Sequence, residues 1–286
     1  MPVEGFELYD VGCSEWGNEI VRAIPYVFYQ VVKEGKKKIG VETTEGMRPF
    51  YFFLKDAQVK IKYPNRDRLS RAHSKIPWQN LYDDELNYKE WLAPPFKEHF
   101  QSQPLILTKK YDPKKPILIV SNKFNREWTQ AGLNAIPIET LEEVFQKCTK
   151  NYNVVYNRIH PKYIVPDSDT LAFEAFPDDT LLGLYPEVID INAIHRVNNL
   201  HGVDVSTMQL RLFSKASRFI NVQGGMMHFA AYFGGKQLCY LVRNGGIHTR
   251  PEDYLKLQSW HKKLGGAEFR VATTGEIGRN LDWLMS

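Results

Sequence analysis

The sequence predicts an α/β protein built from two Rossmann-like domains that face a cleft. Short apolar strands alternate with segments of helical period through residues 116–242, which favours a parallel sheet with helices on both faces. The start of the chain shows the same strand, loop and helix sequence. A basic segment punctuated by proline, KKYDPKKP at 109–116, separates the halves. We therefore expect one domain over residues 1–110 and another over 111–273.

The composition is that of a folded protein and excludes several classes. The 286 residues are 43% hydrophobic and 24% charged, and the net charge of +4 is too small to indicate a nucleic-acid partner. Three widely separated cysteines without CxxC spacing suit a reducing compartment and no zinc site. No apolar run reaches the roughly 18–20 residues of a membrane span. The N-terminus lacks a secretory pattern, so a cytoplasmic location without a membrane span is expected.

The first half yields four elements in order. A strand is expected at 5–11, followed by the loop DVGCSEWGNE at 10–19. Apolar residues then recur every three to four positions, as on one face of a helix, and this helix should end near Gly35. Pro25 should kink this helix or mark its true start. Strands follow at IGVET and QVKIKY, whereas residues 64–100 resist assignment.

The second half alternates more regularly. Strands are expected at PILIV, NVVYNR, RFINV and QLCYLV, with helices over 138–149, around 204–214 and at MMHFAAYF. TLLGLYP is interpreted as a further strand, ending in the loop PEVIDIN.

Two glycines stand between a strand and a helix in RFINV-QGG-MMHF. Gly224 and Gly225 would let a ligand approach the backbone, and the amides of Gly225, Met226 and Met227 could bind a diphosphate, with His228 nearby. A tight turn without any ligand explains the glycines equally well. The pattern is neither a Walker A motif nor a GxGxxG fingerprint.

Polar residues follow the neighbouring strands. Asn122 and Lys123 come after PILIV, and Arg158 comes after NVVY, where cations could bind phosphate oxygens. Tyr185 and Val188 are candidates to pack against a nucleotide base, although ordinary core packing is the alternative.

Acids in the first loop are candidates for a catalytic base. Glu15 and Asp10 lie there, and a carboxylate can take the proton of an attacking sugar hydroxyl. Trp16, Asp67 and His73 are candidates to bind the sugar acceptor. The pair Asp167 and Asp169 matches a DxD metal motif but is interpreted as a turn, so no metal is expected.

These segments resemble the GT-B glycosyltransferases. DVGCSEWGNEIVRAIPYVFY and RFINVQGGMMHFAAYFGGKQLCYLV in particular look like stretches in small GT-B-like proteins of large algal viruses (the chlorovirus type) and of plants. The resemblance implies an N-terminal acceptor domain, a C-terminal domain for a nucleotide-diphosphate sugar, and no metal. It also implies that a final helix, at about 274–286, packs back on the first domain.

The sequence and this resemblance together predict a glycosyltransferase that is inverting and metal-independent. The donor would be a nucleotide-diphosphate sugar, with a UDP-sugar favoured and UDP-xylose one candidate, and the acceptor a glycan. No separate cofactor is expected. The alternatives are a metal-dependent GT-A transferase using Asp167 and Asp169, or a nucleotide- or glycan-binding module without catalysis.

Overall fold

The computed structural model describes residues 6–12, 15–64, 76, 90–126, 133–163, 171–172, 175–242, 254–273 and 275–286. These residues form two compact units, which divide between Pro94 and Pro95 rather than at residue 110. The expected linker belongs to the second unit, because Asn153 Nδ2 donates hydrogen bonds to the carbonyl groups of Asp112 at 2.7 Å and Lys115 at 2.6 Å.

The first unit holds a parallel sheet in the order β1-β2-β3. Its elements are β1 (Glu7–Asp10), α1 (Trp16–Asn18), the π-helical turn η1 (Glu19–Ala23), α2 (Ile24–Val32), β2 (Ile39–Thr44), the 3₁₀ turns η2 (Arg48–Tyr51) and η3 (Asp56–Gln58), and β3 (Val59–Tyr63). Pro25 is the second residue of α2. It does not mark the start of the helical segment, because α1 and η1 lead directly into α2 and the preceding Asn18 and Ala23 are already helical. The π-helical turn η1 lies directly before the proline, whose lack of a backbone N–H group interrupts regular helical hydrogen bonding.

The second unit is built on six parallel strands in the order β12-β11-β10-β4-β7-β9. Their bounds are β4 (Ile117–Ser121), β7 (Asn153–Asn157), β9 (Ile189–Asp190), β10 (Arg218–Val222), β11 (Lys236–Tyr240) and β12 (Glu268–Ala272). Counted within this unit the order is 6-5-4-1-2-3, which is the doubly wound dinucleotide-binding order read from the other edge. The direction of winding therefore reverses between β4 and β10.

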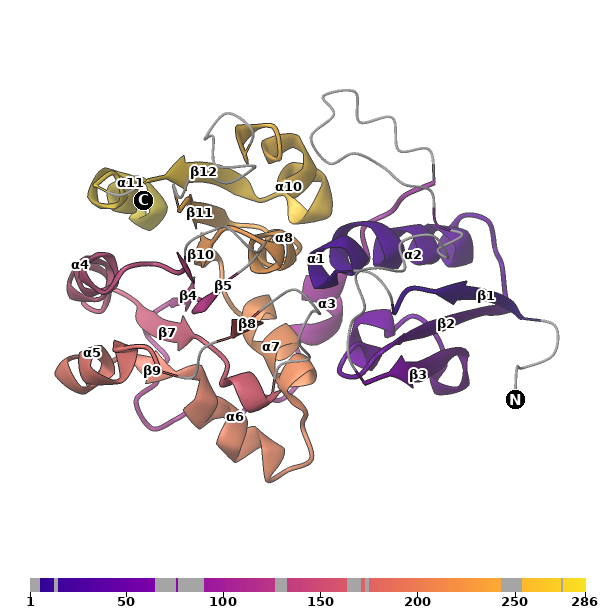
Figure 1. The fold of residues 1–286 in the computed structure, drawn as a ribbon, viewed down its shortest axis with the longest axis horizontal. Helices are drawn as coiled ribbons and strands as arrows, with labels where there is room; N and C mark the ends of the chain where they lie inside the picture. Colours follow the sequence, from indigo (N-terminus) through magenta and orange to yellow (C-terminus); the bar gives the residue numbers. More distant parts are fainter. Residues whose placement is uncertain are drawn as a thin grey trace. The chain divides into compact units, whose positions relative to one another are not determined.

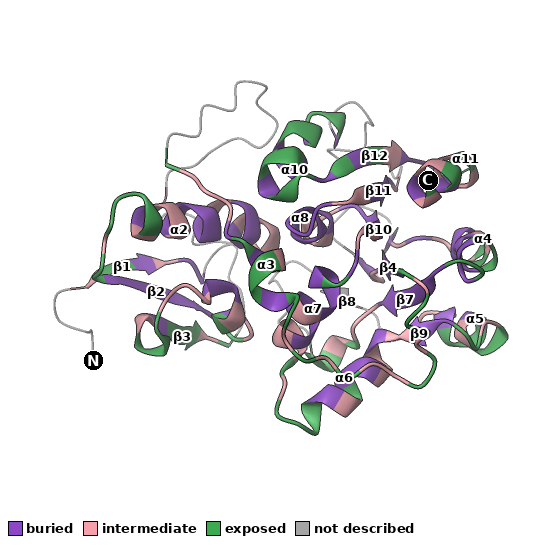
Figure 2. Ribbon diagram, turned by 180° about the vertical axis from the view of Figure 1, so that it is seen from behind, coloured by how far each residue is buried: buried purple, intermediate pink, exposed green. Residues whose placement is uncertain are grey.

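Helices cover both faces of this sheet (Figure 1). One face carries α4 (Ile138–Cys148), α5 (Asp178–Leu184) and α11 (Ile277–Met285). The other carries α3 (Phe96–Phe100), α6 (Ile191–Asn199), α7 (Val205–Ser214), α8 (Gly225–Ala231) and α10 (Gln258–Gly265). A small antiparallel sheet in the order β6-β5-β8 joins Leu133–Asn134, Asn125–Arg126 and Leu171–Ala172. Figure 2 shows the central strands buried between these layers.

The segment TLLGLYP is helical, so its interpretation as a strand was wrong. It forms most of α5, which begins at Asp178 and buries Leu181. Acidic residues in a first helical turn interact favourably with the helix dipole, and Asp178 and Asp179 occupy that turn here.

The C-terminal helix packs within the second unit. Leu281 and Leu284 of α11 are buried in the core that α4 shares with the sheet. Tyr152 Oη donates to the Met285 carbonyl group at 3.1 Å, and Lys236 Nζ donates to that of Trp283 at 3.0 Å. The helix therefore belongs to the second unit, and its return onto the first domain stays a prediction.

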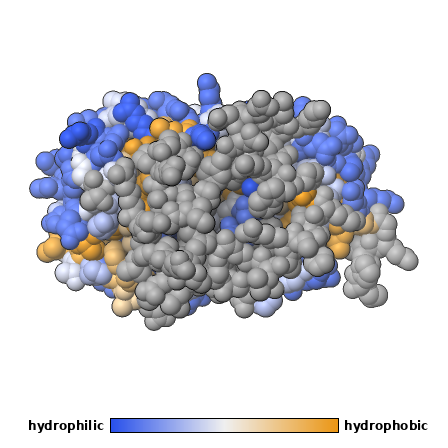
Figure 3. All heavy atoms as spheres, turned by 45° about the horizontal axis from the view of Figure 1, so that its top comes forward, coloured by the Kyte–Doolittle hydropathy of each residue, from blue (hydrophilic) through white to orange (hydrophobic). Residues whose placement is uncertain are grey.

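Within the described ranges, no helix combines the length and the hydropathy needed to cross a membrane. Figure 3 shows a described surface that is mainly hydrophilic, with orange patches between blue side chains.

Candidate functional site

The structure brings Lys123 and Gly224 together at the carboxyl edge of the six-stranded sheet. Strands β4 and β10 are parallel neighbours, with Ser121 paired in register with Asn221. Lys123 follows the end of β4 and Gly224 follows the end of β10. A Cβ atom built on Gly224 would lie 2.8 Å from Lys123 Nζ. The ammonium group therefore lies directly against the turn, at the point where the winding reverses and where ligands of such sheets bind.

The backbone at Gly224 requires glycine. Its φ angle is +121°, a region that side chains rarely adopt. The second glycine pair of this stretch serves a different purpose, because it lies at the opposite edge before β11. A Cβ on Gly235 would come within 2.1 Å of the Ser217 carbonyl oxygen, so that pair permits a close backbone crossing, whereas the first lies against a cation.

The helix that follows the turn uses part of the expected anion-binding backbone for itself. The Met227 amide donates to the Gly224 carbonyl group at 3.1 Å. The amides of Gly225 and Met226 are the remaining candidates. His228 is buried, with Nδ1 at 3.2 Å from Nε2 of His261, so its ring faces α10.

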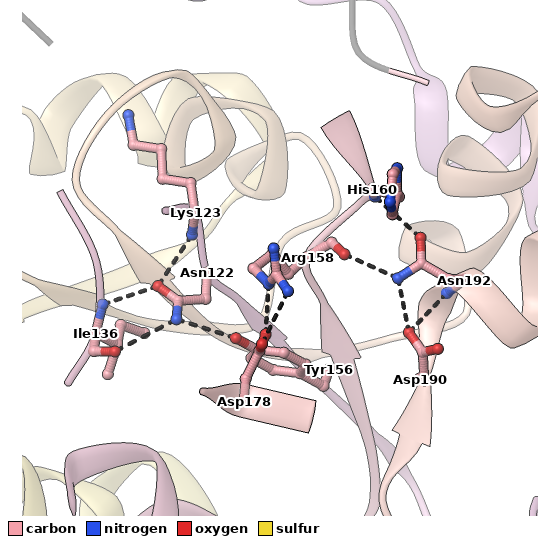
Figure 4. A network of polar contacts seen from close by, with 9 residues as sticks. All are labelled: Asn122, Lys123, Ile136, Tyr156, Arg158, His160, Asp178, Asp190 and Asn192. Atoms are coloured by element: carbon pink, nitrogen blue, oxygen red, sulfur yellow. Dashed lines mark hydrogen bonds and ion pairs between the residues drawn. The ribbon is translucent and has the colours of Figure 1, made fainter. Parts of the chain in front are cut away.

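Asn122 supports Lys123 through its side-chain amide (Figure 4). Its Oδ1 accepts hydrogen bonds from the backbone amides of Lys123 at 2.9 Å and Ile136 at 2.8 Å. Its Nδ2 donates to the Ile136 carbonyl oxygen at 3.3 Å and to the Tyr156 hydroxyl at 3.0 Å. All four hydrogen-bonding positions of the amide are used. Asn122 therefore fixes the chain that carries Lys123, while its role as a direct donor contact stays a prediction.

Arg158 forms an ion pair with Asp178 (Figure 4). Arg158 Nε contacts Asp178 Oδ2, and Nη2 donates to Oδ1 at 2.8 Å. The Asp178 side chain is only 2% exposed and that of Arg158 14%. Burial lowers the pKa of Arg158, but the hydrogen bonds and charge of Asp178 outweigh it and raise that pKa above its ordinary value. The guanidinium group is thus charged, held on one edge, and free to use only the other edge for a ligand.

Tyr185 and Val188 lie at the opposite edge of the sheet from Lys123. Both precede β9, which runs parallel to its neighbour β7, so they lie near its amino end. Val188 is buried in the core, and Tyr185 Oη donates to Glu142 at 3.4 Å. The structure does not bring this pair to the Lys123–Gly224 corner, and their contact with a nucleotide base stays a prediction.

In the first unit, Asp10 is engaged by neighbouring side chains. Its Oδ2 accepts hydrogen bonds from Lys62 Nζ at 2.8 Å and Tyr63 Oη at 2.5 Å, and its Oδ1 accepts one from the Gly12 amide at 3.3 Å. Burial raises its pKa, but Lys62 and Tyr63 more than compensate, so the pKa lies below its ordinary value. A carboxylate with a lowered pKa is a weaker proton acceptor.

Glu15 is the other candidate base. It directly precedes α1 without a side-chain capping hydrogen bond, and its Oε2 accepts a hydrogen bond from Asn18 Nδ2 at 3.3 Å. Trp16 packs edge-on against Phe50, with ring centroids 6.3 Å apart. The remaining candidates of the sequence, Asp67, His73, Asp167 and Asp169, lie outside the described residues.

The sequence did not predict that Tyr156 and Asp178 belong to the polar network around Arg158 and Asn122. Tyr156 lies on β7 and reads as an ordinary core aromatic, and Asp178 reads as a helix-start acid. Acids in a first helical turn are a recognisable signal, but nothing in the sequence pairs Asp178 with Arg158. That pairing depends on the crossover after β7.

No family model matches the chain, and no curated protein matches it. Among solved structures, the chain is similar to the glycosyl transferase family 9 from Veillonella parvula DSM 2008. The two are 9% identical, the match covers 100% of this chain and 92% of the other, and the TM-score is 0.48.

Proposed function

We propose that the chain is a GT-B type glycosyltransferase, which transfers a sugar from a nucleotide-diphosphate donor to a carbohydrate acceptor. One observation carries the proposal: the ammonium group of Lys123 lies against the Gly224 backbone at the switch point of a doubly wound sheet. A cation beside a half-buried glycine turn at that edge suits a diphosphate.

The transfer needs stabilisation of a leaving diphosphate. As the acceptor oxygen bonds to the anomeric carbon, the bond from that carbon to the diphosphate oxygen breaks, and its electron pair leaves with the diphosphate. Lys123 Nζ and the amides of Gly225 and Met226 would stabilise the developing charge. Their positive charges and dipoles would do this without a metal ion, which fits the expected metal-independent reaction.

The expected reaction is a single displacement, which inverts the anomeric centre. The acceptor hydroxyl must lose its proton to a base in the same step. Glu15 and Asp10 are the candidates, and the pKa of Asp10, which Lys62 and Tyr63 lower, makes that carboxylate a weaker base. The donor nucleotide, with UDP favoured, and a cleft between two domains remain predictions.

Ligand-dependent thermal unfolding tests the donor site. A ligand that binds only the folded state stabilises it by about 2.7 kcal/mol at one hundred times its Kd. We expect UDP or GDP to raise the melting temperature of the wild type, and Lys123→Ala to lose most of this shift. Lys262→Ala, which removes an exposed lysine of α10, is the control and should keep it. The proposal fails when no nucleoside diphosphate shifts the wild type.

Turnover separates the enzyme from its alternatives. Release of nucleoside diphosphate from a nucleotide sugar in the presence of glycan acceptors would exclude a binding module without catalysis. Turnover that persists in EDTA would exclude the metal-dependent alternative with Asp167 and Asp169.

A further inference from the structure

We propose that Asp178 is a positioning residue, which holds Arg158 so that its outer guanidinium edge contacts the donor diphosphate. The inference rests on the proposed function and adds a second phosphate contact to Lys123. It depends on three features of the network in Figure 4: how the guanidinium group is held, how its backbone is held, and how both connect to Lys123.

The guanidinium group is held by one edge only. Asp178 engages Nε and Nη2, so Nη1 is directed away from the carboxylate (Figure 4). A fork-to-fork pair fixes the plane of the group as well as its position. Phe176 packs against the guanidinium group as well, with the Cζ atom 5.8 Å from the ring centroid. A cation held in this way loses little further freedom when an anion binds to its open edge.

The backbone of Arg158 is fixed from the other side by α6. Asn192 Nδ2 donates to the Arg158 carbonyl oxygen at 3.0 Å, and Asn192 Oδ1 accepts from the His160 amide at 3.0 Å. Asp190, the residue that caps α6, accepts from both the Asn192 amide and its Nδ2 at 2.9 Å. The chain that leaves β7 therefore has a defined path, and so has the base of the Arg158 side chain.

The same network continues to the other cation. The Tyr156 hydroxyl oxygen accepts a hydrogen bond from Asn122 Nδ2, and Asn122 Oδ1 accepts one from the Lys123 amide. Burial first, and then the negative charge of Asp178, raise the pKa of the Tyr156 hydroxyl, so that this group stays neutral. Arg158 and Lys123 follow adjacent parallel strands, β7 and β4. Two cations preset at neighbouring strand ends match the two charged groups of a diphosphate.

The test compares a nucleoside diphosphate with its monophosphate, because a merely structural defect would weaken both. Asp178→Asn keeps the shape of the side chain but removes the negative charge that holds Nε and Nη2 of Arg158. We expect the affinity for UDP to fall about tenfold or more, as for loss of a charged hydrogen bond, while the affinity for UMP changes less than about twofold. With a nucleotide sugar as substrate, its KM should rise by a similar factor. Asp282→Asn, which removes an exposed acid of α11, is the control and should behave as the wild type.

A second variant keeps the test valid if Asp178→Asn does not fold. Arg158→Met with Asp178→Leu removes both buried charges together, which proteins tolerate better than the loss of one partner. Selective loss of UDP affinity in this folded double variant supports the proposal, and unchanged UDP affinity overturns it. If Lys123→Ala loses UDP while the double variant keeps it, only this inference fails. If the wild type binds no nucleoside diphosphate, the proposed function fails with it.

Discussion

Lys123 and Gly224 illustrate how a single turn can serve both backbone geometry and charge. The φ angle of +121° at Gly224 favours glycine, and the space where a side chain would begin is taken by the Lys123 ammonium group. The two requirements can be separated by experiment, because other glycines with positive φ have open space around them.

Replacement of Gly224 by alanine should therefore harm both stability and binding. A non-glycine residue in a sparsely populated backbone region costs roughly 1–3 kcal/mol, and the new methyl group would displace Lys123 Nζ. Gly202→Ala is the matched control, with φ of +74° and no atom within 4 Å of its Cβ position. Both variants should melt earlier in calorimetry, but only Gly224→Ala should lose UDP affinity by titration. Equal UDP binding by the two variants would show that the ammonium group is not part of the site.

Lys62 provides a second prediction at the scale of single residues. Its ammonium group bridges Asp10 at 2.8 Å and Glu42 at 2.7 Å, and the pKa of each carboxyl lies below its ordinary value because lysine hydrogen bonds outweigh burial. A carboxyl group with a lowered folded-state pKa contributes stability above its unfolded pKa, near 4, and loses it as the pH falls through the folded value.

Lys62→Met should accordingly destabilise the protein by about 1 kcal/mol at pH 7, a modest figure because the lysine is partly exposed. The difference from wild type should begin to shrink as the pH falls below about 4 and be smaller at about pH 3, because the two carboxylates are progressively protonated as the pH approaches their lowered pKa values. Urea unfolding at the two pH values measures it. A difference that is the same at both pH values would contradict a charge-based role for Lys62.

At the scale of elements, the sequence predicted most strands of the second unit but misassigned α5. PILIV, NVVYNR, RFINV and QLCYLV all form strands, since each is a short apolar run bounded by turn residues. TLLGLYP has the same appearance, and such a run does not distinguish a strand from a buried helix. Asp178, in the first turn of α5, binds Arg158 across the fold, and no local pattern reveals this contact.

The position of α11 shows a related limit. The spacing of Ile277, Leu281 and Leu284 predicts one apolar helical face, and all three are buried. An apolar face says nothing of which partner will cover it. Here the partners are α4 and the neighbouring strands.

Truncation of Leu281 should show how much the packing of α11 contributes to the free energy of unfolding. Leu281→Ala removes a fully buried side chain and should cost roughly 2–5 kcal/mol. Arg279→Ala, on the exposed side of α11, should change the free energy of unfolding by less than about 0.5 kcal/mol. Chemical denaturation of both variants measures the difference. Similar small losses in the two variants would mean that α11 does not belong to the core of the second unit.

At the scale of the whole molecule, the candidate corner depends on local sequence features, whereas the division into units depends on contacts between distant residues. Glycines and a lysine after apolar strands are local features, and parallel pairing of β4 with β10 brings them together. The boundary near Pro94 depends on long-range contacts, such as those of Asn153 with Asp112, which no local pattern reveals. The strand order that creates the switch point is likewise a property of the assembled sheet.

A crystal structure with a bound nucleoside diphosphate tests the central claim most directly. We predict phosphate oxygens within hydrogen-bonding distance of Lys123 Nζ and the Gly225 amide, at the carboxyl ends of β4 and β10. Diphosphate density at any other place, with Lys123 still seated against Gly224 and no anion beside it, would contradict the account.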